Sequence, residues 1–151
     1  MEFEQLKLSN QLCFPVYAAS RLITREYKPY LDKLGITYPQ YLVLMVLWET
    51  DGLTVVEIAH KLILNTNTIT PLLKRMESQG ILTRTRSGAD ERKVIVSLTE
   101  KGREMRIQAA TIPEELVKNL KTDSLKVEDL ITLRSTLNNL IDFLIEKDGN
   151  F

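Results

Sequence analysis

A polar, glycine-containing segment separates two runs of β-branched residues in the second half of the chain. The runs are ILTRTR at 81–86 and KVIVSL at 93–98, and the segment between them is SGADER. This alternation predicts two antiparallel strands joined by a long charged tip, a hairpin that we call the wing. Apolar residues elsewhere recur at helical spacing. The chain is therefore predicted to be mostly α, with one small β-hairpin.

Four helices are expected before the wing, and capping signals indicate where two of them begin. The apolar spacing predicts these helices over 9–34, 37–49, 54–62 and 67–79. Thr37 with Gln40, and Thr54 with Glu57, fit the pattern of a capping box. Pro71 is expected near the first turn of the fourth helix, because a proline further in would break the backbone ladder.

Two more helices are expected after the wing. The first begins behind Thr99 and bends or ends at Pro113, and the last runs from about Ser124 to Lys147. Leucines in the last helix alternate steps of three and four, the heptad spacing of a helix that pairs with another. These candidate dimer-interface residues are Leu130, Leu133, Leu137, Leu140 and Leu144. The alternative is that they belong to an internal core.

A formal net charge of zero conceals a basic block in the middle of the chain. Residues 60–106 carry ten Lys and Arg against five Asp and Glu, whereas the segments on either side are acidic. A basic block inside a neutral protein indicates a polyanionic partner for that block alone. The alternative is an ordinary solvated face.

Length and composition favour a single domain over 1–151. No apolar run reaches the length of a membrane span, and the acidic N-terminus lacks the features of a signal peptide. One cysteine cannot form an internal disulfide, so a reducing cytoplasm is the expected setting. One histidine leaves no cluster of metal ligands, and neither a metal, another cofactor nor a catalytic site is expected.

Residues 37–106 follow the order helix, short helix, helix, strand, tip, strand, which is that of a winged helix-turn-helix. The helix expected over 67–79 starts with hydroxyl and amide side chains that can hydrogen-bond base edges and phosphates. Arginines on the wing suit the narrow minor groove. The predicted contacts to double-stranded DNA are Asn65, Thr66, Asn67, Thr68, Thr70, Lys74, Arg75, Arg84, Arg86, Arg92 and Lys93. The alternative is a helix-cap cluster beside a solvated strand face.

The segment from Gly52 to Gly102, which ends in VSLTEKG, resembles the core of the MarR family of bacterial transcriptional regulators. Its most specific signature is the DER at 90–92, followed by a strand and LTEKG. The resemblance implies a dimer of winged helices on a palindromic operator, with dimerisation helices in 1–34 and 107–151. It also implies that Asp90 braces the wing arginines and that Arg92 reaches the minor groove.

Three further segments resemble the branch of this family that responds to organic hydroperoxides, the OhrR branch. They are LSNQLCFPVYAASR, YKPYLDKLGITYPQYLVLMVLWE and TITPLLKRME. The resemblance implies that Cys13 senses peroxide and that Tyr27 and Tyr38 approach its sulfur across the dimer interface, with Tyr17 lining the pocket. Phe14 adds apolar surface that favours organic peroxides over hydrogen peroxide.

The chemistry of such a sensor can be argued from the residues themselves. A thiolate attacks the peroxide oxygen and becomes a sulfenic acid. Phenol O–H donors and a helix N-terminus both favour the thiolate. Without a second cysteine, the oxidised form is a sulfenic acid, a cyclic sulfenamide, or a mixed disulfide with a low-molecular-weight thiol. A bulky adduct at a packed interface would respace the two recognition helices and release the operator.

Two departures from the branch pattern affect these expectations. Pro15 removes a backbone N–H, so the first helix is expected to kink or begin there, which places Cys13 at a helix start or displaces it from the tyrosines. NTNT at 65–68 replaces the usual acidic-small-glycine run, which affects the operator sequence.

Three alternative functions remain open on the sequence. One is a repressor of the same family that is released by a small aromatic or phenolic ligand, with Cys13 inert. Another is a thiol peroxidase-like enzyme, which the missing second cysteine and the winged helix argue against. The last is a dimeric adaptor without DNA affinity, which the basic wing argues against.

Overall fold

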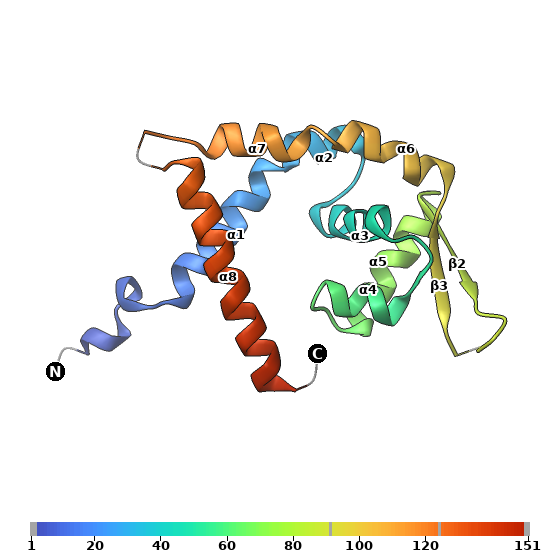
Figure 1. Cartoon of the computed structure of the whole chain (residues 1–151), viewed down its shortest axis with the longest axis horizontal. Helices are drawn as coiled ribbons and strands as arrows, with labels where there is room; N and C mark the ends of the chain where they lie inside the picture. Colours follow the sequence, from blue (N-terminus) through green and yellow to red (C-terminus); the bar gives the residue numbers. More distant parts are fainter. Residues whose placement is uncertain (1–2, 91, 124, 150–151) are drawn as a thin grey trace.

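The computed structural model describes residues 3–90, 92–123 and 125–149, and shows a mostly helical molecule with a small sheet at one end (Figure 1). Glu91 of the predicted wing tip and Ser124, the predicted start of the last helix, lie outside the described residues, as do 1–2 and 150–151 of the predicted domain. In chain order the elements are η1 (Glu4–Leu6), η2 (Leu8–Asn10), α1 (Cys13–Glu26), α2 (Lys28–Leu34), α3 (Tyr38–Glu49), β1 (Leu53–Thr54), α4 (Val55–Lys61), α5 (Thr66–Ser78), β2 (Leu82–Arg86), β3 (Val94–Leu98), α6 (Glu100–Ala109), α7 (Ile112–Leu120) and α8 (Val127–Asp148).

The central strand of the sheet is β3, in the antiparallel order β1-β3-β2. β2 and β3 form the predicted wing, with Leu82 opposite Leu98. The sequence did not predict β1, whose Leu53 lies opposite Val96. A strand of two residues is too short to show an alternating pattern, so only its pairing with β3 reveals it.

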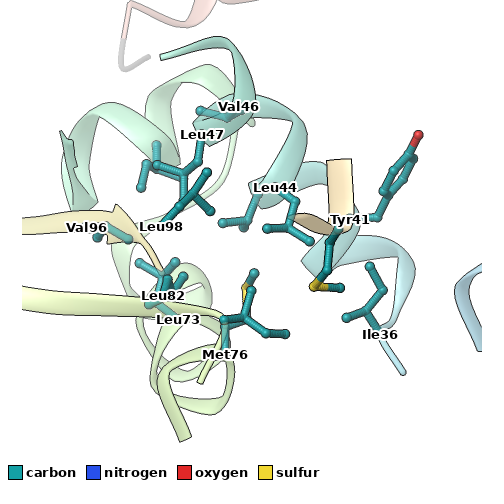
Figure 2. Close-up of a cluster of buried hydrophobic side chains, with 14 of the residues drawn as sticks. Ile36, Tyr41, Leu44, Val46, Leu47, Leu73, Met76, Leu82, Val96 and Leu98 are labelled. Atoms are coloured by element: carbon teal, nitrogen blue, oxygen red, sulfur yellow. The ribbon is translucent and has the colours of Figure 1, made fainter. Parts of the chain in front are cut away.

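The hydrophobic core lies between α3, α4, α5 and the sheet. Figure 2 shows Leu44 and Leu47 of α3 directed toward the side chains of α5 and the strands, among them Leu73, Met76 and Val96. α3 is apolar on nearly every face and buries half of its residues, which confirms the prediction that it is an interior helix. The core therefore fixes α5 and the wing to one another through α3.

The first predicted helix, over 9–34, is two helices that begin later than expected. α1 begins at Cys13, because Pro15 lacks an N–H and fits only within the first turn of a helix. Of the two outcomes that Pro15 left open for Cys13, the structure shows the start of a helix. The chain breaks again at Tyr27, where Pro29 has no N–H to donate to the carbonyl of Arg25.

The expectation that Pro71 lies near the first turn of its helix is wrong. Pro71 is the sixth residue of α5, where it removes the backbone hydrogen bond to the carbonyl of Asn67. Both residues are exposed, so water can satisfy that carbonyl. The helix continues because Ile69 and Leu73 are fully buried on its opposite side, and tertiary packing supplies most of a helix's stability.

Other predicted helix ends are confirmed. The Thr37 N–H donates to Gln40 Oε1 at 2.8 Å, and the Thr99 hydroxyl accepts from the Gly102 N–H at 3.2 Å. Pro113 is the second residue of α7, so the long helix after the wing ends before it, as predicted.

α1 and α8 lie outside the core, and neither helix contains a buried residue. Figure 1 shows α8 as a long separate helix, joined to the winged unit through α6 and α7. Of the predicted heptad leucines, Leu133, Leu140 and Leu144 are exposed, and the other two are half-buried. These leucines therefore form no internal core within one chain. No helix in the described part of the chain is long and apolar enough to cross a membrane.

Candidate functional site

The N-terminal end of α5 presents small polar side chains to solvent. Ile69, Leu73 and Met76 anchor the inner face of the helix in the core, while the predicted contacts Asn65, Thr66, Asn67 and Thr68 are exposed. Thr70 is half-buried, and its hydroxyl donates to the Thr66 carbonyl at 2.7 Å, which leaves the hydroxyl oxygen as an acceptor only. The end of α5 can therefore offer both donors and acceptors to an external partner.

Main-chain hydrogen bonds order the tip of the wing. The Ser87 N–H donates to the Lys93 carbonyl, and the Lys93 N–H to the Asp90 carbonyl, each at 2.9 Å. The Asp90 carboxylate accepts from the backbone N–H of Arg92 at 3.1 Å. In the described part of the tip, Asp90 thus holds the main chain of Arg92, whereas the resemblance implied a brace for arginine side chains.

The basic side chains near α5 and the wing are not equivalent. Lys74, Arg75, Arg86, Arg92 and Lys93 are exposed. These five cations lie on the two elements that a winged helix presents to a duplex, where they can contact phosphates.

Arg84 differs from these cations, because its side chain does not project from the wing as the sequence predicted. It is only 21% exposed and forms an ion pair with Glu77 of α5, with Nη2 and Oε2 2.7 Å apart. Sequence reasoning missed Glu77. The alternation of β2 could have indicated the contact, since Arg84 shares the inward face of that strand with buried Leu82.

Cys13 is an exposed free thiol and the first residue of α1. Tyr17 lies one helical turn further along the same face, and Phe14 is also exposed. The Arg21 guanidinium donates to the Tyr17 hydroxyl at 3.3 Å and lies 5.4 Å from the centre of its ring. This end of α1 therefore presents an exposed thiol beside exposed aromatic side chains.

Tyr27 and Tyr38 lie together, although they come from different elements. Their ring centres are 4.9 Å apart, and Tyr41, a residue that sequence reasoning missed, lies 5.9 Å from Tyr27. Tyr41 follows Tyr38 by three positions, a helical spacing that could have indicated a shared face. Burial, with a smaller contribution from the two neighbouring phenols, raises the pKa of Tyr27 to about 12. Tyr27 therefore remains a hydrogen-bond donor at neutral pH.

Cys13 does not meet these tyrosines within one chain. Cys13 begins α1 and Tyr27 follows its last residue, so at ~1.5 Å per residue they are roughly 21 Å apart along the helix axis. The residues predicted to form one sensor pocket thus lie at opposite ends of α1. Only a second copy of the chain could bring a Cys13 to a Tyr27–Tyr38 pair.

Comparison with protein families supplies evidence independent of this geometry. The family described as transcriptional regulator SarA/Rot matches residues 25–108. The organic hydroperoxide resistance transcriptional regulator of Bacillus subtilis (strain 168) is 49% identical over 147 residues, which cover 97% of this chain and 98% of that protein.

Two solved structures in complex with DNA resemble this fold. Reduced AbfR bound to DNA, a protein of Staphylococcus epidermidis, is 37% identical with a TM-score of 0.71, and the match covers 92% of this chain and 98% of that one. The transcriptional repressor CouR bound to a 23-mer duplex is 26% identical with a TM-score of 0.79, over 93% and 99% of the two chains.

Proposed function

Because this chain belongs to the MarR/SarA family of winged-helix, DNA-binding transcriptional regulators, we propose that it is a repressor that releases its operator when an organic hydroperoxide oxidises Cys13. The observation that carries the proposal is the exposed thiol at the start of α1, a helix that buries none of its residues fully within one chain. Because operator DNA lies in the cytoplasm, the protein would work there.

The uncovered helices support a homodimer. α1 exposes Phe14, Val16 and Leu22, and α8 exposes Phe143 and Leu144. Burial of apolar surface is the main driving force of obligate association. A second copy that covers α1 and α8 would also place two α5 helices at a fixed spacing, which a palindromic operator requires.

The same dimer would bring the Cys13 of one copy to the tyrosine pair of the other. The neutral phenols of Tyr27 and Tyr38 can donate hydrogen bonds to a thiolate, and the N-terminal end of α1 favours a negative charge. Both effects favour the ionised form of the sulfur, which is the form that attacks a peroxide.

The proposed oxidation has two steps. The Cys13 thiolate attacks the terminal oxygen of an organic hydroperoxide, the O–O bond breaks, and an alcohol leaves once its alkoxide takes a proton; the sulfur is now a sulfenic acid. A low-molecular-weight thiol then attacks that sulfur, and water leaves as a mixed disulfide forms. The added group occupies volume at a packed interface, shifts the α1 helices and respaces the two recognition helices.

Replacement of Cys13 by serine tests the oxidation step. Wild-type protein treated with cumene hydroperoxide and cysteine should gain the mass of one cysteine adduct per chain and lose its affinity for operator DNA. Cys13→Ser should gain no mass and should stay bound under the same treatment. Release of the Cys13→Ser protein by the hydroperoxide would disprove sensing at this thiol, and steady-state peroxide consumption with excess thiol would indicate an enzyme.

The two phenols can be tested separately from the thiol. Tyr27→Phe and Tyr38→Phe should react with the hydroperoxide at least several-fold more slowly than wild type, because a hydrogen bond to the thiolate is lost. Tyr30→Phe is the matched control, since the Tyr30 hydroxyl accepts from Asn119 at 3.0 Å and takes no part in the pocket. Unchanged oxidation rates in both pocket variants would remove the tyrosines from the proposal.

A cavity beside Tyr38 favours a second candidate function, a repressor released by a small aromatic or phenolic ligand. This cavity of ≈ 370 Å³ lies between α1, α2 and the start of α3. Its walls combine apolar Leu31 and Ile36 with the cations Arg21 and Arg25. Under this alternative, ligand would release Cys13→Ser from DNA as readily as it releases the wild-type protein.

A further inference from the structure

We propose that the Glu77–Arg84 pair fixes the wing relative to the recognition helix α5, so that Arg84 positions the DNA-reading elements and does not itself bind DNA. The inference needs only the DNA-binding role of the protein. It is independent of Cys13, and every measurement below uses reduced protein.

Three hydrogen bonds join Glu77 and Arg84. The Arg84 backbone N–H donates to Oε1 at 3.0 Å, while Nε and Nη2 both donate to Oε2, at 3.0 and 2.7 Å. Both carboxylate oxygens are therefore occupied, and the guanidinium is held in one orientation. The hydrogen bonds from the Arg84 side chain are also the main reason why the pKa of Glu77 is lowered.

The pair lies where the recognition helix and the wing meet. Glu77 is in the last turn of α5, and Arg84 is the middle residue of β2, opposite buried Val96. Arg86 occupies the same face of β2 but lies two residues nearer the tip, where it is exposed. Arg84 is thus turned toward α5, and Arg86 is free to contact a partner.

Other contacts hold the base of the wing and the far side of β3, where Leu53 and Thr54 of β1 pair with Val96 and Ile95. The Thr99 hydroxyl donates to the Gly80 carbonyl at 2.7 Å, and the Thr99 N–H donates to the Ile81 carbonyl at 3.1 Å. β2 is an edge strand, paired only with β3 in the described sheet, and a two-stranded hairpin alone is marginally stable. The Glu77–Arg84 pair restrains β2 midway between the base of the wing and its tip, and it links this edge strand directly to α5.

A fixed wing matters because two elements must fit the duplex at once. A winged helix places α5 in the major groove and the wing arginines in the adjacent minor groove. A wing that moves freely must be ordered on binding, at a cost in conformational entropy. Loss of the pair should therefore weaken binding even though every DNA-contacting side chain remains.

Two single variants test the pair, and for Glu77→Gln the expected change is opposite in sign to the one that electrostatics alone would give. Glu77→Gln removes a negative charge near a polyanion, so electrostatics alone would strengthen binding; we expect about a tenfold loss instead, as wing mobility dominates. Arg84→Lys keeps the charge but loses the paired Nε and Nη2 donors of the guanidinium, and we expect a similar loss of DNA affinity. Wild-type or tighter binding by either variant would overturn the proposal.

Arg84→Met and Arg86→Met are matched variants, because each removes one positive charge from the same face of β2. Arg86→Met should reduce the slope of log affinity against log salt by about 1, because a phosphate contact is lost. Arg84→Met should weaken binding without that change in slope.

The double variant Glu77→Gln/Arg84→Met should bind no more weakly than Arg84→Met, since both changes remove one interaction. A smaller salt slope in Arg84→Met, or additive losses, would make Arg84 a direct contact.

Hydrogen exchange of the intact reduced protein separates wing mobility from unfolding. In Glu77→Gln the amides of β2 and β3 should exchange faster, while those of α3 should exchange at the wild-type rate. Equal acceleration throughout the chain would show a general stabilising role and would contradict the positioning role.

Discussion

Ile63 adopts a left-handed backbone conformation, with φ of 55°, which a β-branched residue reaches only at a cost. It ends α4 in a Schellman motif: the Leu64 N–H donates to the Ala59 carbonyl at 2.9 Å and the Ile63 N–H to the His60 carbonyl at 3.1 Å. Glycine is the usual residue here. Ile63→Gly should therefore raise the free energy of unfolding by about 1 kcal/mol in urea titrations at fixed protein concentration.

Gly35→Ala is the control for this prediction, because Gly35 adopts nearly the same conformation with φ of 67° and a Cβ added to it would meet nothing within 4 Å. Alanine there should lower the free energy of unfolding by about 1 kcal/mol. A less stable Ile63→Gly protein would mean that the Ile63 side chain contributes more through packing than its backbone strain costs.

The phenol of Tyr27 predicts how stability changes at high pH. Its pKa rises from 10.0 to about 12 on folding, so between these values the unfolded chain loses the proton and the folded chain keeps it. The free energy of unfolding must fall as pH rises through this range. Tyr27→Phe should make the fall shallower in denaturant titrations. The difference in phenolate absorbance between wild type and Tyr27→Phe should titrate near pH 12; titration near 10 would contradict the buried position.

At the scale of elements, α6 packs against the base of the wing so closely that only glycine fits. A Cβ on Gly102 would lie 2.2 Å from the carbonyl oxygen of Ile81, a backbone atom that cannot move aside easily. The Gly102 carbonyl also accepts from the Trp48 indole N–H at 2.8 Å. Gly102→Ala should therefore lower the free energy of unfolding by about 2 kcal/mol in thermal or urea unfolding.

Gly88→Ala serves as the comparison, because a Cβ at Gly88 in the wing tip meets nothing within 4 Å. Its stability should stay within about 0.5 kcal/mol of wild type. Equal stability of the two variants would indicate that α6 moves away from the wing without cost.

The sequence predicted element types well where the signal was local. Capping boxes at Thr37 and Thr54 and the stop before Pro113 need only neighbouring residues, and the structure confirms all three. One prediction failed and one element was missed, for a shared reason. Pro71 stays inside α5 and β1 forms a strand of two residues, because contacts with distant elements outweigh what the local sequence favours.

At the scale of the whole molecule, the uncovered α1 and α8 predict an obligate dimer. Leu140→Asp places a charge in the heptad stripe of α8, where it should shift the protein to monomer in sedimentation experiments. Binding to a palindromic operator should fall by at least tenfold, because two half-sites are then no longer read by one particle. Asn139→Asp adds the same charge at an exposed neighbouring position and should stay dimeric. A dimeric Leu140→Asp protein would place the interface elsewhere.

For the candidate site, as for the fold, some features were predicted from the sequence and others were revealed only by the structure. The basic block of 60–106 and the order of elements around it are properties of the chain, and they predicted a winged DNA-binding unit from the sequence alone. The sequence does not determine which of these cationic side chains remain exposed. Arg84 and Arg86 are equivalent in the sequence, and only the packing of α5 against β2 separates an arginine paired with Glu77 from one open to solvent.

The sequence by itself determined most of the helices, the capping boxes and the hairpin, because each depends on residues within a few positions of one another. Only the tertiary structure decided that Tyr27, Tyr38 and Tyr41 form one cluster, and that Cys13 lies at the far end of α1 from them. The physical reason is that burial and proximity are set by contacts between distant segments, which local propensity does not encode.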